Sequence, residues 1–573
     1  MQSLFDEGRQ YVCLWKHFFA GFFENDWISR KQDMSATLAP VFGLVAVPGL
    51  LLPLLLFPFY EMLGDLPAAR RDPVLWTHIC FYVSFPMLVM GLAAIVEWDT
   101  LLPDPRDYRI LTPLPVRLRT LFAAKCSALL LFMLIFAAAV NVASSVMFPL
   151  VAQLPGVNPL RFMAAHATAL LAATTFTSCL LVALQGAAMN FLSFRWFRRI
   201  SPLLQSLALV GLVCMFFLFP KMSSLFDVRQ ATVHPALAYY PPAWFVGLYL
   251  ELLGQAGPAM HSLARMALLG LVAGAVSCLL AYTLSYWRHV KRSLETVTSL
   301  AGGPGPLKRF LALLADRVLV RHPLERASFH FIGQTLARSR RHRLVMATYA
   351  GVGIALALDS LSLLILRLSH PGASRPGGML LSIQLVLSFF ALCGVRYAFT
   401  IPVELRANWI FQIAESSDGW RHIRSARKAL VVFGGLPPLV VLFPAHCLLW
   451  GWRAAAQHLL YGLVLALVLA RLLLVNFAKI PFTCSYLPGK ANVKLLGAGY
   501  FLAFLIYAYY MADLEARLLQ RPSYLIVFSA AVLVWLAAWD WWATRRNRGA
   551  HRGFAFRFED DPEPTVRTLG LLS

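Results

Sequence analysis

The sequence predicts an all-α polytopic membrane protein with about 12 transmembrane helices, arranged as two six-helix halves with both termini in the cytoplasm. Three observations predict this class: composition, the length of the apolar stretches, and the distribution of Lys and Arg. Hydrophobic residues make up 59% of the 573 residues and charged residues only 14%, whereas a soluble domain carries about 25% charged residues. The composition excludes a soluble protein and predicts contact with the lipid bilayer.

A helix needs about 20 mostly apolar residues to cross the hydrocarbon core. Twelve stretches of suitable length follow one another along the chain. In the first half they lie at about 38–60, 75–96, 127–149, 163–190, 202–220 and 264–286. In the second half they lie at about 344–366, 378–395, 429–450, 456–475, 495–512 and 524–543.

The Lys and Arg residues give the orientation. With the N-terminus in the cytoplasm, the inner segments hold 40 of the 51 basic residues and the outer loops hold 11. Inner loops of membrane proteins are enriched in Lys and Arg. The net charge of +23 is therefore explained by membrane topology, and we expect no nucleic-acid partner. Residues 1–33 mix charges with aromatic residues and do not form a cleavable signal peptide.

The longest inner segment separates the two sets of six stretches and contains Gly302-Gly303-Pro304-Gly305-Pro306, a typical helix breaker. We expect a first transmembrane half at 1–290, a cytoplasmic linker at 291–325 and a second transmembrane half at 326–573. A basic residue opens the third stretch of each half, Lys125 in the first and Arg427-Lys428 in the second. This spacing favours a tandem duplication; the alternative is a coincidence between two basic loops.

Each half also opens with an amphipathic segment. In the first, aromatic residues from Trp15 to Trp27 recur at helical spacing beside Lys16, Arg30 and Lys31. In the second, four apolar residues precede four arginines: Phe329, Phe331, Ile332 and Leu336 come before Arg338, Arg340, Arg341 and Arg343. Such segments suit helices lying in the headgroup plane; the alternative is a cytoplasmic helix packed on its neighbours.

Residues 97–125 form the inner loop with the most informative sequence. Prolines at positions 103, 105, 113 and 115 interrupt helices on either side of a short amphipathic piece. This piece combines apolar residues such as Leu114 with Arg109, Arg117 and Arg119. A rigid knob of this kind could dock into a groove on a soluble partner. The alternative is a solvent-exposed loop whose arginines only set the topology.

This loop resembles the one that joins the second and third spans of ABC-2-type exporter permeases. The matching positions are Asp107, Leu114, Pro115, Arg117, Arg119 and Lys125. Residues 240–245, Tyr-Pro-Pro-Ala-Trp-Phe, are similar to the start of the short amphipathic helix that these permeases carry before the sixth span. The resemblance implies a coupling helix that docks on a separate ATP-binding subunit, present in two copies, at a bacterial plasma membrane.

The second half departs from this pattern. Its counterpart loop lacks the Leu-Pro-basic sequence, and its last outer loop, at about 513–522, is too short for the additional helix. We expect weaker docking there, through Glu404, Arg406, Asn408, Trp409 and Ile410. The inner loop at 479–490 is distinctive, but its sequence indicates no mechanism.

Catalytic and metal-binding motifs are absent from the sequence. It holds no phosphate-binding loop, no HExxH, no GxSxG and no CxxC pair among its nine cysteines. We therefore expect neither an enzyme nor a cofactor, and energy must come from a partner. Polar residues inside spans are functional candidates because lipid disfavours them. The candidates are Asn141, Gln185 and Asp359, with Gln384 and His446 as further polar positions.

The sequence favours the transmembrane permease subunit of an ABC-2-type exporter for a lipid, glycan or peptide-like substrate. A second hypothesis is a secondary active transporter with an internal repeat, in which Asp359 couples transport to protons. A third, a polytopic membrane enzyme, would need acidic or His clusters in outer loops that are short and poor in both.

Overall fold

The computed structural model contains only helical regular elements within its described residues. The described residues are 2–21, 34–98, 117–154, 156–226, 234–293, 310, 312–358, 360–362, 364, 378–403, 411, 420–475, 477, 479–483 and 493–549. The chain divides into two compact units, Met1–Leu300 and Ala301–Ser573, here called unit 1 and unit 2.

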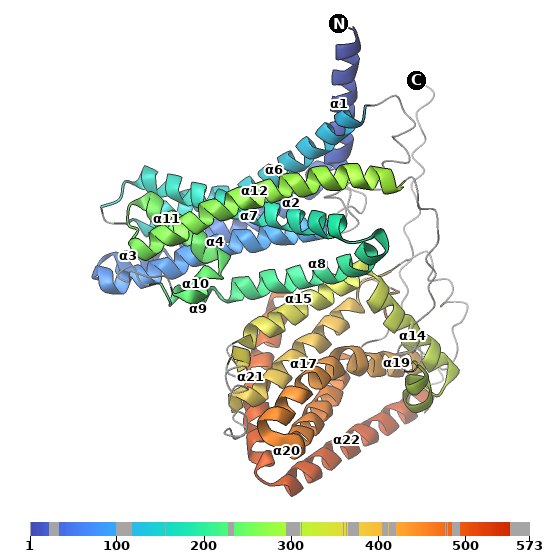
Figure 1. Ribbon diagram of the computed structural model, residues 1–573. Coiled ribbons are helices and arrows are strands. Elements are labelled where there is room, and N and C mark those ends of the chain that lie inside the picture. Colours follow the sequence, from blue (N-terminus) through green and yellow to red (C-terminus); the bar gives the residue numbers. More distant parts are fainter. Residues whose placement is uncertain are drawn as a thin grey trace. The chain divides into compact units, whose positions relative to one another are not determined.

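Unit 1 combines long helices with a few short ones (Figure 1). Its helices are α1 (Gln2–Gly21), α2 (Met34–Leu55), α3 (Phe57–Gly64), α4 (Ala68–Val96), α6 (Leu118–Ala152), α7 (Pro159–Phe191), α8 (Phe194–Phe217), α9 (Phe219–Ser223), α10 (Pro235–Ala238), α11 (Pro241–Leu253) and α12 (Pro258–Ser293). Helix α7 packs against α4, α6, α11 and α12, so it lies at the centre of the unit.

Unit 2 combines long helices with two short π-helical turns. Its elements are η1 (Ala315–Leu319), α14 (Pro323–Arg338), α15 (Arg340–Leu356), α17 (Gly378–Ala398), α19 (Trp420–Leu430), η3 (Val431–Gly435), α20 (Leu436–Leu473), α21 (Val493–Leu519) and α22 (Pro522–Gly549). Helix α17 contacts α15, α20 and α21 and is the central helix of this unit.

These helices confirm an all-α fold with several membrane-crossing segments. Eight helices within the described residues are long and apolar enough to cross a membrane, or nine if α3 and the second half of α2, which meet at a bend of 49°, form one span. Each of the twelve stretches expected from the sequence coincides at least in part with helical backbone. The total of twelve spans and the position of the termini stay predictions.

One of the eight candidates, Trp420–Leu473, is 54 residues long. A straight helix of that length would measure about 80 Å, far more than a hydrocarbon core of about 30 Å. The backbone leaves the helical region at Gly451, where φ is 79° and ψ is 163°. A Cβ atom on Gly435 would lie 3.0 Å from Ala466, and one on Gly462 would lie 2.8 Å from Leu439. The chain therefore turns back at Gly451 and forms two antiparallel helical arms.

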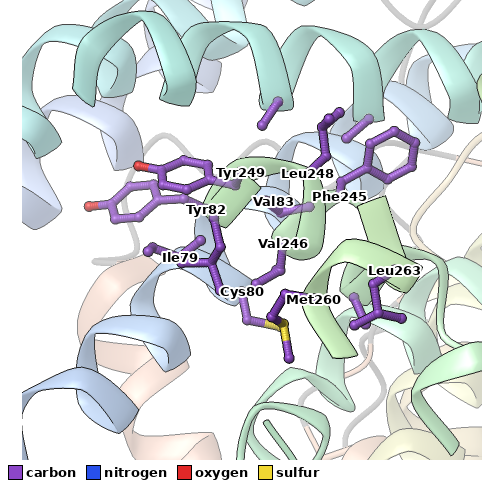
Figure 2. Close-up of a cluster of buried hydrophobic side chains, with 14 of the residues drawn as sticks. Ile79, Cys80, Tyr82, Val83, Phe245, Val246, Leu248, Tyr249, Met260 and Leu263 are labelled. Atoms are coloured by element: carbon purple, nitrogen blue, oxygen red, sulfur yellow. The ribbon is translucent and has the colours of Figure 1, made fainter. Parts of the chain in front are cut away.

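Helix α11 lies in the core of unit 1. Residues on nearly all its faces are buried, among them Phe245, Val246 and Tyr249. Figure 2 shows these side chains meeting Ile79 and Tyr82 of α4. The sequence predicts a helix here, and the structure has one. It is not an amphipathic helix, however, because protein surrounds it.

The opening helices of both units pack on protein. Phe18 of α1 is buried against α6. In α14, Phe329 and Ile332 are buried against α19 and η3. In both helices the apolar face contacts the fold, as the packed-helix alternative proposed.

The connection between α21 and α22 is shorter than expected. The sequence suggests an outer loop at about 513–522, whereas α21 continues to Leu519 and α22 begins at Pro522. As a result, Glu515 belongs to a helix and its side chain is fully buried.

Candidate functional site

The proposed docking segment of unit 1 lies largely outside the described residues, which end at 98 and resume at 117. Asp107, Arg109, Leu114 and Pro115 therefore have no described position, and neither do Asp359 or Glu404, Arg406, Asn408, Trp409 and Ile410 of unit 2. The structure does describe the residues on both sides of each segment, and these show how the segments join the helices.

Before the docking segment, polar side chains bind the end of α4. The last carbonyl groups of a helix have no partner within it. Here Gln205 of α8 donates to the Ile95 carbonyl at 2.8 Å, and Gln185 of α7 donates to the Trp98 carbonyl at 2.5 Å. The Trp98 indole donates to Ser201 Oγ at 3.0 Å. All of these side chains are buried, so the end of α4 is attached to two other helices.

After the docking segment, α6 is attached to α1. Arg117 and Arg119 are exposed at its start. One to two turns later, the ammonium group of the buried Lys125 lies 5.2 Å from the centre of the Phe18 ring, within the range of a cation–π interaction. Ser127 Oγ and the Tyr11 hydroxyl are hydrogen-bonded at 2.7 Å. The two arginines are thus exposed at the start of α6, while Lys125 is part of the packing between helices.

In unit 2, polar side chains join α19 to α14. The buried Glu325 of α14 accepts a hydrogen bond from Lys428 Nζ at 2.5 Å, and Ser425 donates to the Glu325 carbonyl at 2.9 Å. Ser328 and His422 form a further bond of 2.6 Å between α14 and α19. A lysine and a serine thus contact the opening helix in each unit, from α6 in unit 1 and from α19 in unit 2.

The segment before residue 404 is attached through His342. The imidazole Nε2 donates to the Ile401 carbonyl at 3.1 Å, so Nδ1 of the neutral ring accepts from Ser339 Oγ at 2.6 Å. His342 precedes the expected span at 344–366, and burial lowers its pKa. The edge of its ring contacts Phe482 at 4.7 Å between ring centres.

Phe482 belongs to the inner loop at 479–490, of which residues 479–483 are described. Its backbone N–H donates to the Phe399 carbonyl at 3.1 Å, and its carbonyl accepts from Val403 at 3.2 Å. This part of the loop packs on α14 and α15 and on the end of α17. The structure thus assigns a packing role to a loop for which the sequence indicated none.

The two described intramembrane candidates differ. Gln185 binds a backbone carbonyl, as described above, and so has a structural role. Asn141 of α6 is 2% exposed, and neither amide atom has a hydrogen-bond partner within the described residues. No contact within the described residues of unit 1 thus explains why the polar side chain of Asn141 is buried.

Sequence reasoning named His446 and Gln384 as polar positions but missed two buried side chains beside them in unit 2, His458 and Glu515. His458 of α20 and Glu515 of α21 are fully buried, with Nδ1 and Oε1 2.5 Å apart. The ring of His446 stacks on Trp450 and lies 4.6 Å from the His458 ring. Gln384 of α17 donates to the His458 carbonyl at 2.8 Å.

The sequence does contain a signal for Glu515. Phe504 and Ala512 are buried, and their spacing places Glu515 on the same face of α21, whereas Asp513 and Arg517 form an exposed ion pair on another face. An acidic residue on the apolar face of a helix indicates a buried partner, which here is His458.

Unit 1 has a related pair that is not ionic. His166 of α7 and the Tyr249 hydroxyl of α11 are 3.0 Å apart, and both residues are fully buried. Figure 2 shows Tyr249 on α11 beside the side chains of α4. Tyr249 is thus hydrogen-bonded to a buried histidine, as Glu515 is in unit 2.

No group of three or more His, Cys, Asp or Glu residues is placed to hold a metal ion within the described ranges. Comparison with protein-family models, curated proteins and solved structures finds no match to this chain.

Proposed function

We propose that the chain is the transmembrane permease subunit of an ABC-2-type exporter, driven by a separate ATP-binding subunit that docks on residues 104–119. The observation that carries this proposal is the attachment of both sides of the segment to the helical bundle. Gln185 and Gln205 hold the end of α4, and Lys125 and Ser127 hold the start of α6.

This attachment supports force transmission. Each buried hydrogen bond that loses its partner costs about 1–3 kcal/mol, so the ends of the segment move together with α7, α8 and α1. A push on the segment by the ATPase would then tilt several helices at once. If exposed linkers joined the segment to the helices, a push would move the linkers, and the helices would not tilt.

We propose further that the two units derive from one six-span unit. In support, each opening helix is attached to the third-span helix by a lysine and a serine, through Lys125 and Ser127 in unit 1 and Lys428 and Ser425 in unit 2. Two ATPase copies would then dock on the pseudo-dimer, one on each inner segment. The proposed location is a bacterial plasma membrane, with no catalytic activity in this chain.

The test uses a candidate ATPase with a phosphate loop, sought among the genes next to the one that encodes this chain. In the full-length protein, Leu114→Asp places an unpaired charge in the proposed contact, so the ATPase should no longer co-purify and its hydrolysis should not be stimulated. Ile410→Asp is the matched change in unit 2 and should have a weaker effect. Unchanged co-purification and stimulation by the Leu114→Asp protein would exclude docking through this segment.

The secondary transporter remains the alternative proposal. It requires a proton-coupling carboxylate, for which the sequence offers Asp359. Transport of a substrate into vesicles in response to a pH gradient, without ATP or an ATPase subunit, would favour this alternative.

A further inference from the structure

We propose that His458 and Glu515 form a proton-binding site at the outer end of unit 2. This inference goes beyond the proposed exporter function and does not depend on the source of energy. The ligand is the proton itself, and binding it changes the charge of a site that is enclosed by helices α17, α20 and α21.

The proton count follows from the geometry. His458 Nδ1 and Glu515 Oε1 are 2.5 Å apart. When the imidazole is neutral, Nδ1 carries its hydrogen, donates to the carboxylate, and leaves the pair with one negative charge. Addition of one proton gives either an imidazolium–carboxylate pair or a neutral imidazole with a carboxylic acid. In both cases the net charge of the pair is zero.

The surroundings make this one charge significant. Both side chains are fully buried, and a buried charge is costly unless it is paired. The titratable groups that face the pair are His446 and Tyr461 on α20 and Tyr507 on α21. The group from α17 is Gln384, an amide. None of these side chains is a permanent cation, so the added proton is the means by which the pair becomes neutral.

The pair also has polar atoms available. Within the described residues, His458 Nε2, Glu515 Oε2, His446 Nε2 and Trp450 Nε1 are buried and have no hydrogen-bond partner. Buried polar atoms in folded proteins are nearly always hydrogen-bonded. Two imidazole nitrogens and a carboxylate oxygen can accept a proton, and the three rings lie within 5.5 Å of one another.

The comparison with unit 1 shows that this arrangement is particular to unit 2. His458 follows the turn at Gly451 by seven residues, and His166 follows Pro159, the first residue of α7, by seven residues. Each histidine is hydrogen-bonded to a residue between the fifth and sixth expected spans, Glu515 or Tyr249. Tyrosine ordinarily titrates near pH 10 and a carboxyl near pH 4, so the unit 2 pair holds the group that can be charged near neutral pH.

The predicted orientation places the site near the outer face. The turn at Gly451 lies in the outer connection expected between the stretches at 429–450 and 456–475, and Glu515 lies beyond the outer end of the stretch at 495–512. Protons would therefore enter from outside. Since the pair joins α20 to α21, and Gln384 joins it to α17, a change in its charge would alter the packing of all three helices.

The test is infrared difference spectroscopy on full-length protein in phosphatidylcholine vesicles. Spectra are recorded as the pH is lowered from about 8 to about 5, the range over which histidine changes charge. The wild-type protein should show a band from a buried carboxyl or a new imidazolium. This signal should disappear in Glu515→Gln. Tyr249→Phe, the matched change in unit 1, should keep it.

A second variant provides the same test if the Glu515→Gln protein does not fold. In His458→Phe/Glu515→Leu both polar partners are replaced by apolar side chains, a change that buried pairs often tolerate. If this variant melts cooperatively and lacks the signal, the proposal is supported. The same pH-dependent signal in the wild type, in Glu515→Gln and in the double variant would overturn it, as would a wild-type protein with no such signal.

Discussion

The rings of His446 and His458 lie 4.6 Å apart, although the two residues are twelve positions apart in the chain. Along a straight helix, twelve residues rise about 18 Å. The contact therefore depends on the reversal at Gly451, which brings the adjoining ends of two antiparallel arms together. The buried polar group of unit 2 exists because of this turn.

The turn predicts a specific sensitivity at Gly451. Its φ of 79° and ψ of 163° fall in a region populated almost only by glycine, where other residues are strained by about 1–3 kcal/mol. Gly451→Ala should therefore lower the stability of unit 2 by that amount, measured by thermal melting in detergent. Gly211→Ala in α8 is the control, because a Cβ atom there meets no neighbouring atom, and alanine in a helix should stabilise slightly. Equal melting temperatures for Gly451→Ala and the wild type would show that the turn is not strained.

The end of α4 gives a second prediction. Gln185→Leu removes the donor to the buried Trp98 carbonyl, and an unpaired buried carbonyl costs about 1–3 kcal/mol. We expect a lower melting temperature and weaker coupling, so that a docked ATPase still co-purifies but its hydrolysis is stimulated less. Gln255→Leu, a change at an exposed position in unit 1, should leave both measurements unchanged. Full stimulation of hydrolysis by the Gln185→Leu protein would show that force transmission does not require this hydrogen bond.

Helix positions could be predicted from the sequence because the bilayer fixes the length of an apolar stretch. The turn at Gly451 followed from the same reasoning, since residues 429–475 exceed one crossing and Gly451 and Arg453 interrupt the apolar run. The count of twelve spans remains a prediction, because eight or nine helices meet the criteria within the described residues.

The polar residues were harder to interpret. Gln185 was a functional candidate by its position in a span, but its partner is a backbone carbonyl from a different helix, and sequence spacing does not reveal such a contact. Glu515 was overlooked because it follows the apolar stretch at 495–512 and resembles a loop residue. Its burial depends on the packing of α21 against α20, and the hydropathy of a sequence does not predict which helices pack together.

His342 predicts a pH dependence of stability. Burial lowers the pKa of its imidazole in the folded protein, whereas the unfolded value is about 6.5. The unfolded state then binds more protons below that pH, so the contribution of His342 is present above pH 6.5 and is lost as the pH falls. Melting temperatures between about pH 5 and pH 8 should fall less steeply towards acid in His342→Gln than in the wild type. Parallel curves would contradict a neutral buried His342.

Asp359 separates the two transport hypotheses. If energy comes from a partner's ATP, Asp359→Asn should leave ATP-dependent transport largely intact, because no step requires its charge. The measurement is transport per inserted protein in vesicles that contain the ATPase subunit, with expression and insertion checked by gel filtration. Loss of transport with normal insertion would favour proton coupling through Asp359.

The last prediction concerns orientation, on which both the docking segment and the proton site depend. The Lys and Arg distribution places residues 97–125 inside and the connection at 221–262 outside. Both regions offer exposed positions for labelling, Arg117 at the start of α6 and Gln255 after α11. In a variant whose nine cysteines are replaced, Gln255→Cys should react with a membrane-impermeant maleimide in intact cells. Arg117→Cys should react only after the membrane is opened. The reverse result would place residues 104–119 away from any cytoplasmic ATPase and would move His458 and Glu515 to the inner face. Labelling of both positions in intact cells would place them on the same side of the membrane, separated by an even number of crossings. The alternation of basic segments would then need another explanation.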